Sequence, residues 1–179
     1  LTTNDSIIDQ LAALDQAESQ FRSENIKFGI RHRMRSGKTL LNHTRFLGYT
    51  KGPDGVLQIV PEEAEIVRMI FDLYVQGNGV RKIKKYLESH GIKTVTGKSE
   101  WSTSTIDRML SNEKYVGQVL MQKSYVPDFL TGKKEKNRGQ LEMYLVENAH
   151  EPIIDRETFE RVQEMKGRIK HTVQMEQML

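Results

Sequence analysis

Apolar residues recur at helical spacing through the first segment of the chain, from Ser6 to about Arg35, and no proline interrupts them. Spacings of three and four residues place such side chains on one face of a helix. We therefore predict one long helix over 1–35. Its apolar face is narrow, which indicates that it packs against a partner chain or a further domain. The apolar positions are Ile7, Leu11, Leu14, Ala17, Phe21, Ile26 and Ile30.

A linker and a short hairpin are predicted next. Residues 35–50 show no regular apolar period and contain two glycines, which is typical of an extended connection, so we predict a basic linker over 36–47. The turn sequence Gly52-Pro53-Asp54-Gly55 separates the short apolar pieces 46–49 and 56–60. This arrangement predicts a small β-hairpin.

Two helices follow the hairpin. Pro61 suits a first helical turn, acidic residues follow it, and apolar pairs at 66/67, 70/71 and 74/75 give a wide buried face before Gly77 and Gly79 end the helix. A second helix is predicted over 80–90, with Val80, Ile83 and Leu87 facing inward. Its outward residues are basic: Arg81, Lys82, Lys84 and Lys85.

The remainder is predicted to mix helices and strands. Ser102 is expected to cap a third helix that buries Ile106, Met109 and Leu110, and Asp155 to cap a last helix that buries Phe159, Val162, Met165 and Ile169. Strands are expected over 115–122 and 141–146, separated by a polar loop over 127–139. We therefore predict a mainly helical α+β fold, with a domain over 48–168 and a helical tail over 169–179.

The order of these elements is that of a winged helix-turn-helix, in which the second helix enters the DNA major groove. The candidate DNA contacts are Ser104 and Thr105 at the start of that helix, Arg108 one turn later, and Lys133 and Lys134 in the hairpin loop. The alternative is that the Ser and Thr residues only cap and solvate the helix. The predicted turn is also longer than in the compact motif.

Charge is unevenly distributed along the chain. The net charge is +3, but residues 1–21 carry four acids and no Lys or Arg, whereas residues 22–51 carry eight basic residues and one acid. Residues 79–98 carry six basic residues and one acid. This segregation indicates a polyanionic partner, here duplex DNA, although solvated helix faces explain it equally well.

The basic residues at the end of the first helix continue into the linker, which is typical of an arm that enters a DNA minor groove. A basic helix terminus could instead reflect the helix dipole, but that does not explain Lys38 and Arg45. The candidate DNA-binding residues of this arm are Lys27, Arg31, Arg33, Arg35, Lys38 and Arg45.

Other classes of site are not indicated. The sequence has no cysteine, and its five histidines lack metal-ligand spacing, so we expect no metal site. Gly37-Lys38-Thr39 is not a phosphate-binding loop, because His32 occupies the position of the required glycine. No Ser–His–acid set stands out, and no apolar run approaches 18 residues. We expect no cofactor, no small-molecule substrate and no membrane span.

Four blocks, at 18–38, 48–92, 101–120 and 150–163, together resemble the recombinase domain of large serine recombinases, within the resolvase/invertase superfamily. The resemblance implies a parent enzyme that assembles as a dimer or tetramer and integrates or excises a mobile element through a serine–DNA intermediate. It also implies that the catalytic domain precedes this chain, that a zinc ribbon follows it, and that the chain itself is not an enzyme. Arg22 and Glu24 would lie near the crossover site.

On this resemblance the chain binds attachment-site DNA in the bacterial cytoplasm, associated with the nucleoid. A winged-helix transcriptional regulator is one alternative, but it does not explain the acidic-then-basic leading helix. A protein-interaction module is another, and it predicts DNA binding that vanishes at moderate salt and lacks sequence preference.

Overall fold

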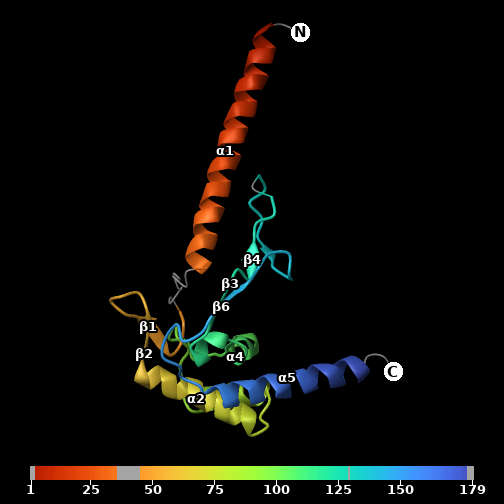
Figure 1. The fold of residues 1–179 in the computed structure, drawn as a ribbon. Coiled ribbons are helices and arrows are strands. Elements are labelled where there is room, and N and C mark those ends of the chain that lie inside the picture. The colour runs from red at the N-terminus through yellow and green to blue at the C-terminus, as the bar shows by residue number, and fades with distance from the viewer. Residues whose placement is uncertain (1–2, 36–44, 129, 177–179) are drawn as a thin grey trace. The chain divides into compact units, whose positions relative to one another are not determined.

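The computed structural model describes residues 3–35, 45–128 and 130–176, with side chains described for 8–32, 45–128 and 130–168. Within these residues it contains five α-helices, one 3-10 helix and three two-stranded sheets, so the predicted mainly helical α+β fold is confirmed (Figure 1). The chain divides into two compact units. One comprises residues 1–39 and 120–145, and the other residues 40–119 and 146–179.

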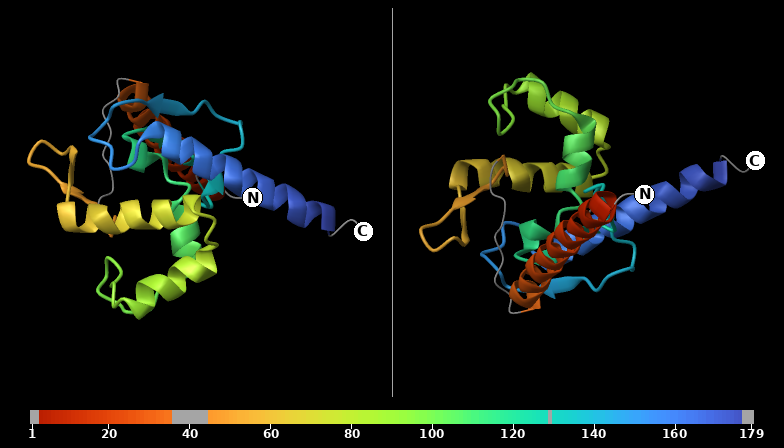
Figure 2. Two further views of the ribbon diagram at one scale, coloured as in Figure 1. Left: turned by 90° about the horizontal axis from the view of Figure 1, so that it is seen from below. Right: turned by 90° about the horizontal axis from the view of Figure 1, so that it is seen from above.

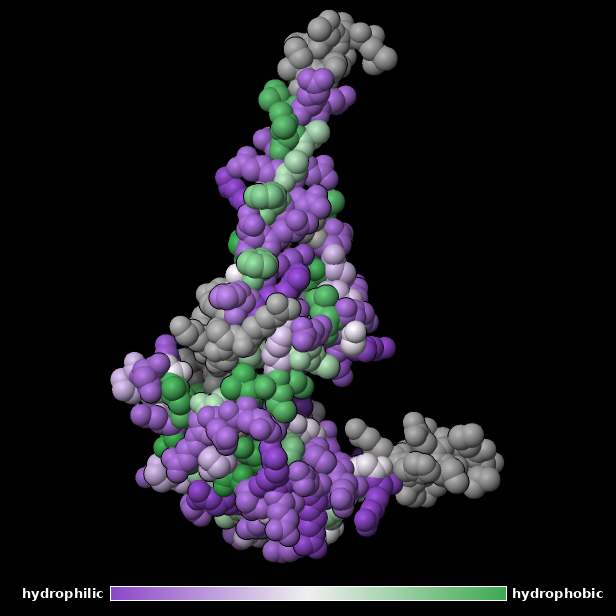
Figure 3. Space-filling view, viewed as in Figure 1, coloured by the Kyte–Doolittle hydropathy of each residue, from purple (hydrophilic) through white to green (hydrophobic). Residues whose placement is uncertain are grey.

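The long leading helix is confirmed as α1, Thr3–Arg35. Its large apolar side chains are exposed along most of its length, from Ile8 to Ile30. Figure 3 shows apolar side chains scattered among hydrophilic ones on this helix. Ion pairing adds little to it, since the described Arg22–Glu18 bridge of 2.6 Å is highly exposed.

The predicted first hairpin is present, but its first strand begins only at the end of the predicted piece 46–49, and its second strand is shorter than predicted. β1, Tyr49–Lys51, pairs antiparallel with β2, Leu57–Ile59, in the register Tyr49↔Ile59. Asp54 orders the turn, because its Oδ1 accepts the Val56 N–H at 3.1 Å. Leu47 precedes β1 and is buried in the core of its unit.

Helices α2, Pro61–Val75, and α3, Val80–Ser89, match the predicted pair. Pro61 occupies the first turn of α2, and the acidic residues beside it suit the positive end of the helix dipole. α2 packs against α5, and α3 packs against both α2 and α4 (Figure 2). The buried residues of the two helices are Ala64, Val67, Ile70, Phe71, Tyr74, Ile83 and Leu87.

The predicted third helix is α4, Thr103–Met109, and Ile106, Met109 and Leu110 are buried as predicted. The predicted strand over 115–122 is wrong at its start. Residues Glu113–Val116 form a 3-10 helix instead, because the Asn112 side chain accepts the Lys114 N–H. The strand itself is β3, Val119–Met121.

The second predicted hairpin is present but has two tiers. β3 pairs with β6, Tyr144–Val146, so the strand predicted over 141–146 is shorter than expected. The loop predicted over 127–139 is not purely irregular. It contains β5, Glu135–Lys136, which pairs antiparallel with β4, Ser124–Tyr125.

The last helix is α5, Arg156–Glu176, and its predicted cap is confirmed. Asp155 Oδ1 accepts the Thr158 N–H at 2.8 Å. Hydrogen bonds from the backbone and the side chain of Thr158 favour the ionised carboxylate of Asp155 and so lower its pKa. Phe159, Val162 and Met165 contribute to the core, while the Ile169 side chain lies outside the described ones.

Candidate nucleic-acid interface

The start of α4 is fixed against the end of α3 by Trp101, which is only 2% exposed. Its indole N–H donates to the Ile92 carbonyl at 2.7 Å, and its backbone N–H donates to Glu88 Oε1 at 2.8 Å. Lys84 lies 3.6 Å from Glu88 and 3.7 Å from Glu100, so one lysine bridges α3 and the connection that leads to α4.

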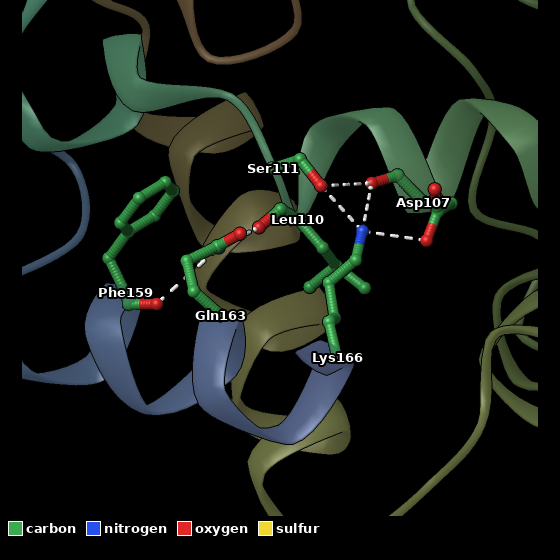
Figure 4. Close-up of polar contacts among 6 residues, drawn as sticks. All are labelled: Asp107, Leu110, Ser111, Phe159, Gln163 and Lys166. Carbon is green, nitrogen blue, oxygen red and sulfur yellow. Dashed lines mark hydrogen bonds and ion pairs between the residues drawn. The ribbon is translucent and has the colours of Figure 1, made fainter. Parts of the chain in front are cut away.

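The other end of α4 is held by two side chains of α5 (Figure 4). Lys166 Nζ donates to the Asp107 carbonyl at 2.8 Å, and Gln163 Nε2 donates to the Leu110 carbonyl at 2.7 Å. The last carbonyls of a helix have no hydrogen-bond donors within the helix. Lys166 and Gln163 provide such donors for two of them. A cation also suits the negative end of the helix dipole. The orientation of α4 is therefore set from both ends.

Ser102 occupies the predicted N-cap position of α4 but makes no capping hydrogen bond with its side chain. The prediction that it caps the helix is thus right in position and wrong in mechanism. Its hydroxyl lies 2.7 Å from that of Ser104 instead. Both residues are exposed, so this pair of hydroxyls faces solvent at the first turn of α4.

A hollow of about 200 Å³ opens beside α4. Its polar lining includes Arg45, Thr105 and Arg108, and all three are exposed. Leu47, Trp101 and Tyr115 are buried side chains that also line it. The hollow therefore combines an apolar floor with two guanidinium groups from segments far apart in the sequence.

An aromatic cluster under this hollow secures the segment that carries Arg45. The Tyr115 hydroxyl donates to the Leu47 carbonyl at 3.0 Å, and the Tyr49 hydroxyl donates to the Glu151 carbonyl at 2.7 Å. Burial raises the pKa of both tyrosines well above 10, so their hydroxyls stay protonated and remain donors. Arg45 itself has a positive φ of 61°.

His150 packs edge-on against Tyr49, with the ring centroids 4.9 Å apart. One ring nitrogen, Nε2, lies 2.6 Å from the Lys114 carbonyl, whereas the buried Nδ1 has no partner within the described part of the chain. Burial lowers the pKa of His150 below 6.5, which favours the neutral ring. The role of His150 is therefore structural.

A second basic surface lies in the other unit, between α1 and the β4–β5 hairpin. Lys27 and Arg31 of α1 and Lys134 of the hairpin line one groove of about 570 Å³. Lys27 Nζ lies 3.4 Å from the Val126 carbonyl, which links the helix to the hairpin. The predicted arm and the predicted hairpin loop thus meet in one groove.

The structure sorts the predicted DNA-binding residues into two groups, and their role in binding stays a prediction. Arg45, Thr105 and Arg108 share the hollow, with exposed Ser104 on the same helix. Lys27, Arg31 and Lys134 share the groove, and Lys133 is exposed next to Lys134. The side chains of Arg33 and Arg35, and all of Lys38, lie outside the described parts.

Two residues that line the hollow, Thr94 and Asn112, were not predicted. They lie in the connections between helices, where no periodic pattern could indicate them. Over the described ranges, no group of His, Asp and Glu residues is placed to hold a metal ion. Nor does any helix among the described residues have the length and apolar character needed to cross a membrane.

The chain matches a recombinase family model, and proteins with similar sequences or structures include a putative recombinase and an LSR–DNA complex. The family model described as Recombinase matches residues 61–168. A protein of Bacillus subtilis (strain 168) described as "Putative DNA recombinase" is 25% identical over 172 residues, covering 88% of this chain and 34% of that protein.

Two solved structures share the fold. One, described as "Crystal Structure of a LSR-DNA Complex", matches with a TM-score of 0.58 and 26% identity over 82% of this chain and 38% of that one. Another, described as "Sequence Requirements of the Listeria innocua prophage attP site", matches with a TM-score of 0.52 and 26% identity over 80% of this chain and 52% of that one.

The chain spans about a third of the Bacillus relative and about half or less of each matched structure. The family match nevertheless covers more than half of the chain, and it includes every helix from α2 to α4 and the first half of α5. The predicted resemblance is confirmed: this chain belongs to the Recombinase family and is the recombinase domain of a large serine recombinase.

Proposed function

We propose that this chain is the DNA-binding part of a site-specific recombinase and that it recognises duplex attachment-site DNA. The observation that carries the proposal is the hollow beside α4, where Arg45, Thr105 and Arg108 lie together. Guanidinium and hydroxyl groups are the side chains that most often contact phosphates and base edges. The matched structures, described as an LSR–DNA complex and a prophage attP site, support the same partner.

In this proposal α3 and α4 act as the two helices of a winged helix-turn-helix, and the β3–β6 hairpin with its β4–β5 extension acts as the wing. α4 enters the major groove, where Arg108 can donate two hydrogen bonds to a guanine. Arg45 contacts the backbone or the minor groove beside it. Lys133 and Lys134 reach phosphates from the hairpin.

The chemistry of recombination is assigned to other parts of a longer protein, which assembles as a dimer or tetramer on bacterial chromosomal DNA. Incubation of the chain with supercoiled plasmid should therefore leave the topology unchanged, and reproducible nicking that copurifies with the protein would contradict this assignment.

The Arg108→Ala variant tests the reading role of α4. Loss of a good base contact costs about 1–3 kcal/mol, so the ratio of cognate to random affinity should fall roughly 5- to 150-fold. Binding can be measured by fluorescence anisotropy with labelled cognate and random duplexes. Arg161→Ala is the matched control, because Arg161 is an exposed arginine on α5 that does not line the hollow.

The Lys38→Ala variant separates positioning from reading. As a residue of the proposed arm, Lys38 contacts the backbone, so its loss should weaken cognate and random binding by similar factors. If Arg108→Ala leaves the affinity ratio unchanged while the domain stays folded, α4 is not the reading helix. If the unaltered chain shows no salt-dependent DNA binding, the proposed function itself fails.

A further inference from the structure

The groove in the first unit is built from two segments far apart in the sequence. Its α1 wall consists of Lys27, Ile30 and Arg31, whose spacing of three and four residues places them on one helix face. Its other wall is the β4–β5 hairpin, which runs beside the C-terminal half of α1 in Figure 1. The hairpin residues that line the groove are Gln122, Ser124, Tyr125, Val126, Pro127, Lys134 and Leu141.

The buried side chain of Asn137, which is only 4% exposed, helps to hold the hairpin wall in place. Its Nδ2 donates to the carbonyls of Gln122 and Leu141, at 2.8 and 2.7 Å, and both residues line the groove. Its Oδ1 accepts the N–H groups of Gly139 and Leu141, at 3.0 and 3.2 Å. A fully satisfied buried amide of this kind rigidifies its surroundings, so this wall does not need to form on binding.

The lining of the groove combines positive charge with apolar surface. Three lining residues are cationic and none is acidic. Ser124 and Tyr125 add hydroxyl donors, which commonly contact phosphates. Ile30, Leu141 and Pro127 add apolar surface to the same groove. A ligand that fits this lining is a repeating polyanion whose charges are separated by less polar segments.

We propose that this groove is a second DNA site, in which α1 and the hairpin together grip the sugar–phosphate backbone of one strand. Lys27, Arg31 and Lys134 neutralise successive phosphates, and Ile30 and Leu141 pack against the deoxyribose between them. The proposal rests on the proposed function, because it assumes the same duplex as ligand. It adds that the basic residues of α1 and of the hairpin act on one strand as one site.

Scanning the duplex with single neutral methylphosphonates tests whether the site is shared. Each replaced phosphate that the unaltered chain contacts should lower its affinity. In the Lys27→Ala variant, replacement of one particular phosphate should no longer lower the affinity, and the same should hold for one phosphate in the Lys134→Ala variant. These two phosphates should be the same or adjacent on one strand. Loss of sensitivity at distant phosphates or on opposite strands would overturn the groove as a single site.

Two matched pairs of variants test the lining. Lys134→Ala removes a groove cation, whereas Lys136→Ala removes an exposed cation of the same hairpin that does not line the groove. If Lys134 neutralises one phosphate, its loss lowers the salt slope by about 0.9. The affinity ratio of unaltered chain to variant should then fall about 3.5-fold between roughly 50 and 200 mM salt. Lys136→Ala should leave the slope unchanged.

For the apolar surface, Ile30→Ser is compared with Ile26→Ser, one turn away on the same helix. Ile26 is 63% exposed and lies outside the groove, whereas Ile30 is 38% exposed and lines it. Ile30→Ser should weaken DNA binding roughly three- to tenfold, the scale of returning part of an isoleucine side chain to water. Ile26→Ser should have no effect. Circular dichroism checks that α1 remains helical in both variants.

The outcomes distinguish this proposal from the proposed function. If both groove variants behave like their controls while Arg108→Ala still lowers the cognate preference, the groove does not bind DNA and the function assigned to α4 stands. The apolar and basic lining would then serve a protein segment instead. If the unaltered chain fails to bind duplex DNA at all, both proposals fall together.

Discussion

Replacement of Lys166 by methionine tests whether α5 holds α4 in place. Lys166 is 8% exposed, and its ammonium group lies 2.8 Å from the Asp107 carbonyl, 2.6 Å from Asp107 Oδ1 and 2.5 Å from the Ser111 hydroxyl. Methionine has a similar length and can keep the packing of the aliphatic stem. The change therefore removes the polar contacts and leaves most of the apolar ones.

The expected loss of unfolding free energy follows from the environment of each contact. A hydrogen bond from a charged donor contributes about 1.5–3 kcal/mol, but the Asp107 carbonyl keeps the Ser111 hydroxyl as a second donor at 3.2 Å. The Asp107 side chain is 57% exposed, so its ion pair with Lys166 contributes at most about 1 kcal/mol. Burial of a charged lysine also has a cost that methionine avoids. We expect a net loss of about 1–2 kcal/mol.

Urea unfolding measures this loss, with the fluorescence of Trp101 as the probe, since it is the single tryptophan and lies at the start of α4. The midpoint should fall while the slope stays constant, because the surface exposed on unfolding is unchanged. Arg168→Met is the control: the Arg168–Glu164 pair is 4.0 Å apart and both side chains are more than 70% exposed. It should cost less than about 0.5 kcal/mol. Equal losses in both variants would refute the anchoring role of Lys166.

Two further predictions concern His150, which packs against Tyr49, and Gly117, which lies next to the His150 carbonyl. Because burial lowers the pKa of His150, the unfolded state binds a proton more readily than the folded state once the pH falls below 6.5. The contribution of neutral His150 to the free energy of unfolding is therefore full above that pH and decreases below it. Urea midpoints at about pH 7.5 and 5.5 should differ more for the unaltered chain than for His150→Gln, and an equal difference would rule out His150 as the cause. Gly117 has a φ of 76°, and a Cβ there would lie 2.7 Å from the His150 carbonyl oxygen, whereas Gly91 has a φ of 67° and open space around it. Gly91→Ala should therefore cost about 1–2 kcal/mol from backbone strain alone, and Gly117→Ala clearly more; similar thermal midpoints for the two variants would contradict the steric argument.

The helices were predictable because their burial follows the local period of the sequence. In α2 and α3 the residues predicted inward, such as Val67, Ile70 and Ile83, are fully buried. Asp155, the predicted cap of α5, accepts a hydrogen bond from the Thr158 N–H. Each of these features depends on residues within a few positions of one another, so the sequence pattern contains the necessary information.

The second hairpin was predicted less well because distant residues determine it. The Tyr115 carbonyl accepts N–H groups from Ile153 and Ile154, each at 2.9 Å, which fixes the chain before β3 to the segment before α5. The inner tier β4–β5 has only two residues in each strand, and Asn137 ties it to Gln122. Alternation over two residues gives no periodic signal, and a buried asparagine looks like an ordinary loop residue in the sequence.

The candidate site shows the same division between local and distant information. Thr105 was predicted from its position at the start of a helix, Arg108 from its position one turn later, and Arg45 from its place in a basic segment. Nothing in the sequence places Arg45 in the same hollow as Arg108, because that proximity comes from tertiary packing, to which the hydrogen bond from Tyr115 to Leu47 contributes. Residue types were therefore predictable, whereas their grouping into a hollow and a groove required the tertiary structure.

The way α4 is held has a consequence for specificity under the proposed function. Trp101 fixes one end of the helix and Lys166 the other, and neither contact uses the exposed side chains of Ser104, Thr105 or Arg108. Surface substitutions away from caps and core contacts usually change stability by less than about 0.5 kcal/mol. These three positions can therefore vary with little cost to the fold, so that one scaffold can present different reading surfaces to different DNA sites.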